Sequence, residues 1–179
     1  MNIIVNRKKE IILTNGLVFV NYFLDRITKL LAVLYLKGNE PIEYFNGIFR
    51  LIYAENTGAF LSLGKNWNIY VKYIVLLIIP IIICLFGIIY LMLKEKKFYR
   101  IIILSCIIGG GLGNLFDRLF NNFTVIDFMN FGIGNIRTGI LNVADLPVTF
   151  GVIILIIFEF IVNKKEKKIK INIGEKKIE

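Results

Sequence analysis

GGGLGNLFDRLFNNFTVIDFMNFGIGNIRTGILNVADLPVTFG, residues 109–151, is the stretch on which both the fold and the function of this chain depend. It carries three aspartates, Asp117, Asp127 and Asp145, between two segments that are otherwise apolar enough to lie in a lipid bilayer. An unpaired ionisable group is costly in hydrocarbon, so such groups are expected only where they serve a function. These aspartates are therefore the first candidates for a functional site.

The composition is that of a membrane protein. Of the 179 residues, 56% are hydrophobic, and the mean hydropathy is +0.70, which exceeds that of an ordinary soluble domain. Runs of about 20 apolar residues can cross the hydrocarbon core, and we expect one polytopic domain over residues 1–163 with a basic cytoplasmic tail over residues 164–179. The expected membrane spans are residues 11–36, 69–93, 101–119 and 141–162. The first run is too long and too charged for a cleaved signal peptide and has no Ala-x-Ala-like exit, so we interpret it as a retained helix.

Two outer loops, residues 37–68 and 120–140, carry the expected β structure. The segment Gly-Ile-Phe-Arg-Leu-Ile-Tyr (residues 47–53) is rich in aromatic and β-branched residues and is bounded by turn formers, which predicts a strand lying on the membrane surface. A hairpin is expected around residues 132–139. The predicted fold class is therefore an all-α membrane protein with a small β element.

The positive charge indicates how the chain is oriented. The net charge of +9 is concentrated in lysine and arginine clusters at residues 7–9, 94–100 and 164–170. Because these clusters flank apolar runs, orientation and anionic lipid explain them better than nucleic-acid binding does. By the positive-inside rule both termini and the middle loop are cytoplasmic, which places the costly polar groups of three spans together at the outer membrane boundary.

The side chains that are missing limit the chemistry. The sequence has no histidine, which removes Ser-His-Asp and Cys-His catalysis and most zinc sites. Cys84 and Cys106 lie in apolar runs without metal-like spacing and are interpreted as packing residues. A dyad of Ser62 with Lys65 remains a weak alternative. Carboxylate chemistry is left, because two close carboxylates share a proton and can activate water for hydrolysis of a peptide bond. Composition does not decide which two of Asp25, Asp117, Asp127 and Asp145 form the pair.

Structural interpretations compete with the functional one at several motifs. Asp25 and Lys29 are four residues apart on one helix face and can form an ion pair. Asn-Thr-Gly (residues 56–58) predicts a turn in which the glycine can take a positive φ. Gly109 and Gly113 form a small-xxx-small pair that allows close helix packing. Asn142 or Asp145 can cap the last helix, with Pro147 in its first turn.

Five motifs in order resemble those of bacterial lipoprotein signal peptidase, the type II signal peptidase. They are Asp-x-x-Thr-Lys (residues 25–29), Asn-Thr-Gly-Ala (56–59), Gly-Asn-Leu-Phe-Asp-Arg (113–118), Val-Ile-Asp-Phe (125–128) and Asn-Val-Ala-Asp (142–145). The resemblance covers about residues 11–163. It implies four transmembrane helices, an extracytoplasmic β-rich cradle, and an aspartyl protease that cuts signal peptides from diacylglyceryl-modified prolipoproteins just before the lipidated cysteine.

The resemblance also implies roles for single residues. The catalytic pair would be Asp127 and Asp145, and Asp117 would be a structural partner. The positions that match substrate-binding or site-supporting residues are Asn56, Gly58, Asn114, Arg118, Asn142, Asp25 and Lys29. No cofactor or metal is implied, and the expected partners are lipid-modified prolipoproteins and membrane lipids. We expect a monomer in the bacterial cytoplasmic membrane, with both termini cytoplasmic and the active site at the extracytoplasmic face.

The chain departs from the family pattern at three positions. Arg26 stands where the family usually has Gln, Phe60 interrupts the usual Gly-Ala-Ala-Phe, and Leu141 replaces a usual Phe. These departures bear on substrate fit and not on the reaction. Two other classes compete with this one. A small transporter or proton channel predicts a midplane site, and a structural membrane subunit predicts that conservative changes at Asp127 or Asp145 act only through folding.

Overall fold

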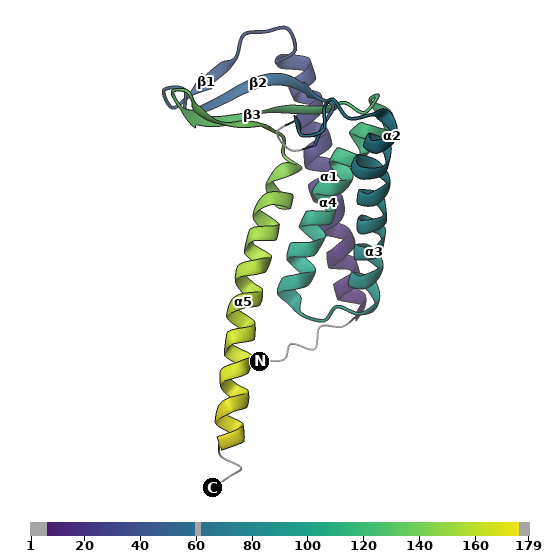
Figure 1. Ribbon diagram of the computed structural model, residues 1–179, viewed down its shortest axis with the longest axis vertical. Coiled ribbons are helices and arrows are strands. Elements are labelled where there is room, and N and C mark those ends of the chain that lie inside the picture. The colour runs from purple at the N-terminus through teal and green to yellow at the C-terminus, as the bar shows by residue number, and fades with distance from the viewer. Residues whose placement is uncertain (1–6, 60–61, 176–179) are drawn as a thin grey trace.

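Helices form the long axis of the molecule, and a sheet lies across one end of them (Figure 1). The computed structural model describes residues 7–59 and 62–175. Its helices are α1 (Arg7–Tyr35), α2 (Ile69–Lys72), the π-helical η2 (Tyr73–Ile78), α3 (Ile79–Leu93), α4 (Phe98–Phe120) and α5 (Asp145–Glu175). Helix α1 begins, and α5 ends, at the end of the molecule away from the sheet (Figure 1).

Within the described part of the chain, three helical segments are long and apolar enough to cross a membrane: Ile69–Leu93, Phe98–Phe120 and Asp145–Lys165. Helix α1 has 29 residues, but its asparagines and its charges at Asp25, Arg26 and Lys29 lower its hydropathy. The first of the three segments joins α2, η2 and α3. Its widened π turn ends two residues before Pro80, whose missing N–H and bulky ring disturb regular helical bonding.

The fourth expected span has different bounds in the structure. Residue 141 ends a strand, so helix α5 begins at Asp145 and not at 141. The helix continues through the expected end at residue 162 as far as Glu175, and therefore includes most of the segment that we expected to form a tail.

The sheet has four antiparallel strands in sequence order: β1 (Ile42–Tyr44), β2 (Phe49–Asn56), β3 (Val125–Ile133) and β4 (Ile136–Leu141). The strand predicted at residues 47–53 corresponds to β2. The predicted hairpin is β3–β4, with Gly134 at a φ of +57° in its turn. Strand β2 pairs with β3 so that Ala54 lies opposite Asp127, after a register shift that follows Leu51.

Close packing of α1 on α4 depends on two glycines of α4. A Cβ atom at Gly113 would lie 2.4 Å from Asp25 Oδ2, and one at Gly109 would lie 2.7 Å from the carbonyl oxygen of Val18. The expected small-residue contact is therefore present, and it brings the charged part of α1 against α4. This contact positions the polar residues of both helices beneath the sheet.

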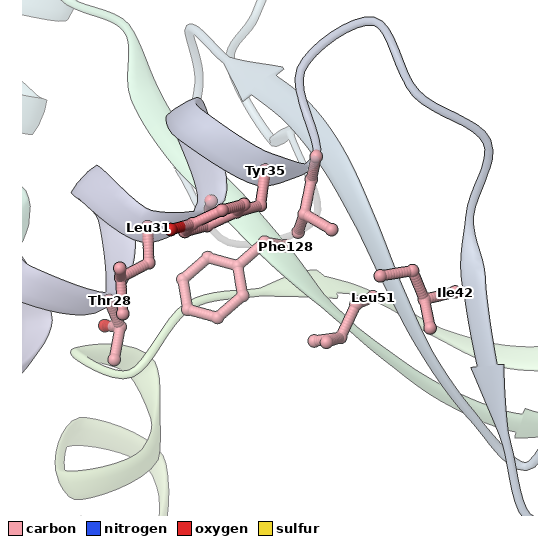
Figure 2. A pocket seen from close by; sticks show the side chains of 8 residues that line it. Thr28, Leu31, Tyr35, Ile42, Leu51 and Phe128 are labelled. Atoms are coloured by element: carbon pink, nitrogen blue, oxygen red, sulfur yellow. The ribbon is translucent and has the colours of Figure 1, made fainter.

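An apolar cavity of about 250 Å³ lies between the last turns of α1 and one face of the sheet (Figure 2). Leu31 and Tyr35 of α1 line it together with Leu51 and Phe128 of the strands. Successive side chains of a strand point to opposite faces. Asp127, which precedes Phe128, accordingly lines a different and polar cavity on the other side of β3.

Candidate active site

A small polar cavity of about 50 Å³ lies where α4, the start of α5 and the strands β2 and β3 meet. Six of the residues that the sequence singled out line it: Asn56, Asn114, Arg118, Asp127, Asn142 and Asp145. Gly58, Asp25 and Lys29 do not line the cavity. Gly58 and Lys29 each form a hydrogen bond with a residue that lines it, and Asp25 accepts one from the N–H of Ala144, the neighbour of Asp145. The structure therefore gathers residues from all five motifs around one point.

Asp127 is held on β3 by two amide side chains. Its Oδ1 accepts a hydrogen bond from Asn142 Nδ2 at 2.6 Å, and its Oδ2 accepts one from Asn56 Nδ2 at 3.0 Å. The residue is only 4% exposed. Burial raises the pKa of Asp127 to about 6, the nearby charge of Asp145 acts in the same direction, and the two amide donors oppose the rise. Asp127 can therefore hold a proton near neutral pH.

Asp145 is the first residue of α5 and forms a reciprocal cap with Asn142. The Asn142 N–H donates to Asp145 Oδ2 at 2.9 Å, and the Asp145 N–H donates to Asn142 Oδ1 at 3.1 Å. This is the geometry of a capping box. The other oxygen, Oδ1, accepts from Asn114 Nδ2 at 3.0 Å. The cap and the site thus use different oxygens of one carboxylate, so the two interpretations of Asp145 do not exclude each other.

The Asn-Thr-Gly motif forms one wall of the cavity. Asn56 Oδ1 accepts from the Gly58 N–H at 2.9 Å, and this turn directs Asn56 Nδ2 to Asp127. The expectation of a positive φ at Gly58 is wrong, because its φ is not in the left-handed region. Glycine is needed there for space instead. A Cβ would lie within 2.7 Å of backbone atoms of Ser62 and Leu63. Arg118 donates to the Gly58 carbonyl at 3.0 Å and so holds this wall.

A buried charge cluster lies next to the cavity. Lys29 Nζ is 2.8 Å from Asp25 Oδ2, 2.8 Å from Asp117 Oδ2 and 2.9 Å from Asn114 Oδ1. All three charged residues are at most 1% exposed. The expected ion pair of Asp25 with Lys29 is therefore present as part of a larger network. Asp25 and Asp117 both contact the ammonium group of Lys29, whereas Asp127 and Asp145 accept hydrogen bonds from amide groups.

Of the three departures from the family pattern, Arg26 has a clear contact. Its guanidinium forms an ion pair with Asp117 Oδ1 and lies 4.6 Å from the centre of the Phe116 ring. It does not line the polar cavity, so the expectation that it affects substrate fit gains no support from its position. Leu141 ends β4 opposite Met129. Phe60 lies outside the described residues.

The serine alternative has no supporting geometry. Ser62 and Lys65 are both exposed, and the hydroxyl of the buried Ser105 donates to the Ile101 carbonyl at 2.5 Å. The polar cavity instead presents two carboxylates whose four oxygens each accept a hydrogen bond. Such an arrangement can orient a water molecule between a proton acceptor and a proton donor.

The chain is similar to known proteins over most of its length. The family described as Signal peptidase (SPase) II matches residues 17–161. The lipoprotein signal peptidase of Borrelia hermsii (strain HS1 / DAH) is 36% identical over 153 residues, which are 83% of this chain and 89% of that protein. That of Borreliella afzelii (strain PKo) is 38% identical over 148 residues, 80% of this chain and 86% of that protein. A bacterial membrane enzyme solved by the in meso method at 2.3 Å has the same fold, with a TM-score of 0.72 at 24% identity over 86% of this chain and 90% of that one.

Proposed function

The chain belongs to the signal peptidase II family, and from this premise we propose that it is an aspartyl endopeptidase that removes signal peptides from diacylglyceryl-modified prolipoproteins. The bond cut is the one on the N-terminal side of the lipidated cysteine. The observation that carries the mechanism is the pairing of Asp127 and Asp145 around one small polar cavity, without a cation in contact with either carboxylate among the described residues.

The pair acts on water. In the singly protonated state one carboxylate accepts a proton from the attacking water, while the other donates a hydrogen bond to the carbonyl oxygen of the scissile bond. The proton then passes to the leaving nitrogen as the tetrahedral intermediate breaks. The buried Nε of Arg118 has no hydrogen-bond partner within the described residues, so it is available to hold a carbonyl group of the substrate beside the pair.

The same proposal places the protein in the bacterial membrane as a monomer with four spans. Helix α1 supplies the first span, since large apolar side chains along its length, including Phe19, Phe23, Leu30 and Leu34, are exposed and can face lipid. The basic clusters at residues 7–9 and 94–100 lie at the end of the bundle away from the sheet (Figure 1), which favours cytoplasmic termini and an active site on the extracytoplasmic face. All the acids of the cavity lie at one end of the helices, unlike the midplane sites of transporters.

The substrate preference follows from the position of the proposed site at the membrane surface. A catalytic pair at the membrane surface reaches a bond that is held at the same depth, and a diacylglyceryl group anchors the neighbouring cysteine there with about 0.8 kcal/mol for each buried CH₂. We therefore expect lipid-modified precursor to be cut far faster than unmodified precursor. Equal cleavage of both would contradict the proposed substrate class.

The test is a gel-shift assay with purified full-length protein and both precursors. Asp127→Asn and Asp145→Asn should each abolish cleavage of the lipid-modified precursor, and the double variant should lose little more than either single variant, because residues that act as one unit are not additive. Asp117→Asn is the matched control and should lower the yield of folded protein more than the rate per folded molecule. A folded Asp127→Asn or Asp145→Asn protein that cleaves at the parent rate would refute the aspartyl mechanism.

A further inference from the structure

The two carboxylates of the polar cavity have unequal surroundings, and the difference begins at Lys29. From the hydrogen-bond network we propose that Lys29 is a positioning residue that, through the side-chain amide of Asn114, keeps Asp145 ionised as the base and leaves the shared proton on Asp127. This inference rests on the proposed function, because it assigns the two roles within the same pair.

The orientation of the Asn114 amide is fixed by Lys29. An ammonium group can only donate hydrogen bonds, so the Asn114 atom 2.9 Å from Lys29 Nζ has to be the carbonyl oxygen. The same oxygen accepts from Asn142 Nδ2 at 3.1 Å. The NH₂ group of Asn114 is thereby directed at Asp145 Oδ1, 3.0 Å away. A reversed amide would bring a carbonyl oxygen against the Asp145 carboxylate.

The remaining contacts of Asp145 also favour its anion. Its Oδ2 accepts a backbone N–H, which cannot reverse its polarity. The residue lies in the first turn of α5, where the partial positive charge of the helix end stabilises a carboxylate. Asp127 lies on a strand and has no comparable field. It does accept two amide hydrogen bonds, but its burial and the nearby Asp145 charge still raise its pKa to about 6.

The charges that face the pair are balanced when the pair holds one proton. Helix α1 contributes Asp25, Arg26 and Lys29, and helix α4 contributes Asp117 and Arg118. In the cluster the two negative charges of Asp25 and Asp117 match the two positive charges of Lys29 and Arg26. Arg118 is the remaining cation, and its guanidinium donates to the carbonyl oxygens of Asn114 and Gly58. One negative charge on the pair completes the balance.

Arg26 contributes indirectly. Its ion pair with Asp117 Oδ1 means that Lys29 does not have to neutralise two carboxylates alone. With the neutral Gln that the family usually carries at this position, the cluster would hold one net negative charge. The cluster as a whole would then exert a less positive field on Asn114 and Asp145. Arg26 is accordingly a second positioning residue, one step further from the pair.

The test is the pH profile of kcat/KM for full-length protein in detergent with lipid-modified precursor. The low-pH limb reports ionisation of the base. Lys29→Met removes the charge and the donor that orient Asn114, so this limb should move to higher pH by about one unit, which lowers activity about tenfold on that limb. The high-pH limb, which reports loss of the Asp127 proton, should move less. Lys37→Met, a change at an exposed lysine paired with Glu55, is the matched control and should leave both limbs in place.

A second variant separates positioning from folding. Lys29→Met combined with Asp25→Asn restores the charge balance of the cluster but not the contact with Asn114. If Lys29 serves only to neutralise buried acids, this double variant will fold and show the parent pH profile, and the inference is overturned. If Lys29 positions Asn114, the double variant will fold and keep the shifted low-pH limb.

A third variant keeps the test decisive if the double variant does not accumulate. Arg26→Gln changes a partly exposed side chain and should move the low-pH limb in the same direction by a smaller amount. An unmoved limb in that variant would then overturn the inference. Failure of the proposed function gives a different result, because the parent protein itself would not cleave the precursor.

Discussion

Asp127→Asn should make the protein more stable at neutral and alkaline pH while it abolishes cleavage. In the folded state the pKa of Asp127 is raised from 3.8 to about 6, so folding favours the protonated form. A raised carboxyl pKa lowers stability as the pH rises from about 4 through 6, and the full cost is present above that range. A rise of about two pKa units corresponds to about 3 kcal/mol. The variant has no ionisable group at this position and escapes this cost.

The hydrogen bonds of Asp127 reduce the expected gain. Both of its oxygens accept from amide NH₂ groups, those of Asn142 and Asn56. An asparagine at position 127 presents its own NH₂ to one of them, which loses one buried hydrogen bond at a cost of about 1–2 kcal/mol. The net gain at pH 8 is therefore about 1–2 kcal/mol, or a rise in Tm of several degrees at about 2–4 °C per kcal/mol for a chain of this size. At pH 4 the gain disappears and the variant should melt below the parent.

The measurement is thermal unfolding in detergent at pH 4 and pH 8, followed with a dye that reacts with Cys84, a buried thiol that unfolding exposes. Asp117→Asn is the control of opposite sign. It weakens the buried ion pairs with Lys29 and Arg26, and breaking a buried pair costs about 3–5 kcal/mol. If Asp127→Asn lowers Tm at pH 8 as much as Asp117→Asn does, Asp127 is a structural residue and the reasoning from its burial is wrong.

Three further predictions follow from the same geometry. Cleavage should decline as the pH rises above about 6, where Asp127 loses its proton; a rate that is constant between pH 6 and 9 would contradict this. Gly113→Ala should destabilise the protein by about 1–3 kcal/mol through its contact with Asp25, whereas Gly16→Ala, with open space around it, should be neutral or stabilising in the same dye assay. Single cysteines in residues 94–97 should react with thiol reagents only from the cytoplasmic side, and those near Lys65 only from the outside.

Composition and periodicity were sufficient to predict the three apolar helices that can cross a membrane and the strand β2. An apolar run long enough to cross a membrane has few structural alternatives to a helix. A cluster of aromatic and β-branched residues between turn formers, outside the membrane, has few alternatives to a strand. The last helix begins four residues later than the sequence predicts. Leu141 is apolar and looks like part of the span, but its backbone pairs with Met129 in the sheet, and local hydrophobicity does not reveal that pairing.

Contacts between separate elements were the part that spacing could not predict. Arg26 is 91 residues from Asp117 in the sequence, and nothing local indicates that they pair. The same holds at the other end of the bundle, where Glu159 of α5 accepts from Arg100 at 2.5 and 2.6 Å and from Tyr99 at 2.9 Å. A lone acid in an apolar span was a signal that could have pointed to this contact, because such a charge requires a partner.

The four aspartates look alike in the sequence, and the kind of group that contacts each one separates them in the structure. Asp25 and Asp117 each form a buried ion pair with the ammonium group of Lys29. Asp127 and Asp145 contact asparagine amides and backbone N–H groups, which orient a carboxylate without neutralising it. Two acids that are oriented but not neutralised repel each other's charge and hold one proton between them. The asparagines of the family motifs are thus as necessary to this chemistry as the acids, because a lysine at the position of Asn114 would orient Asp145 equally well and would remove its ability to share a proton.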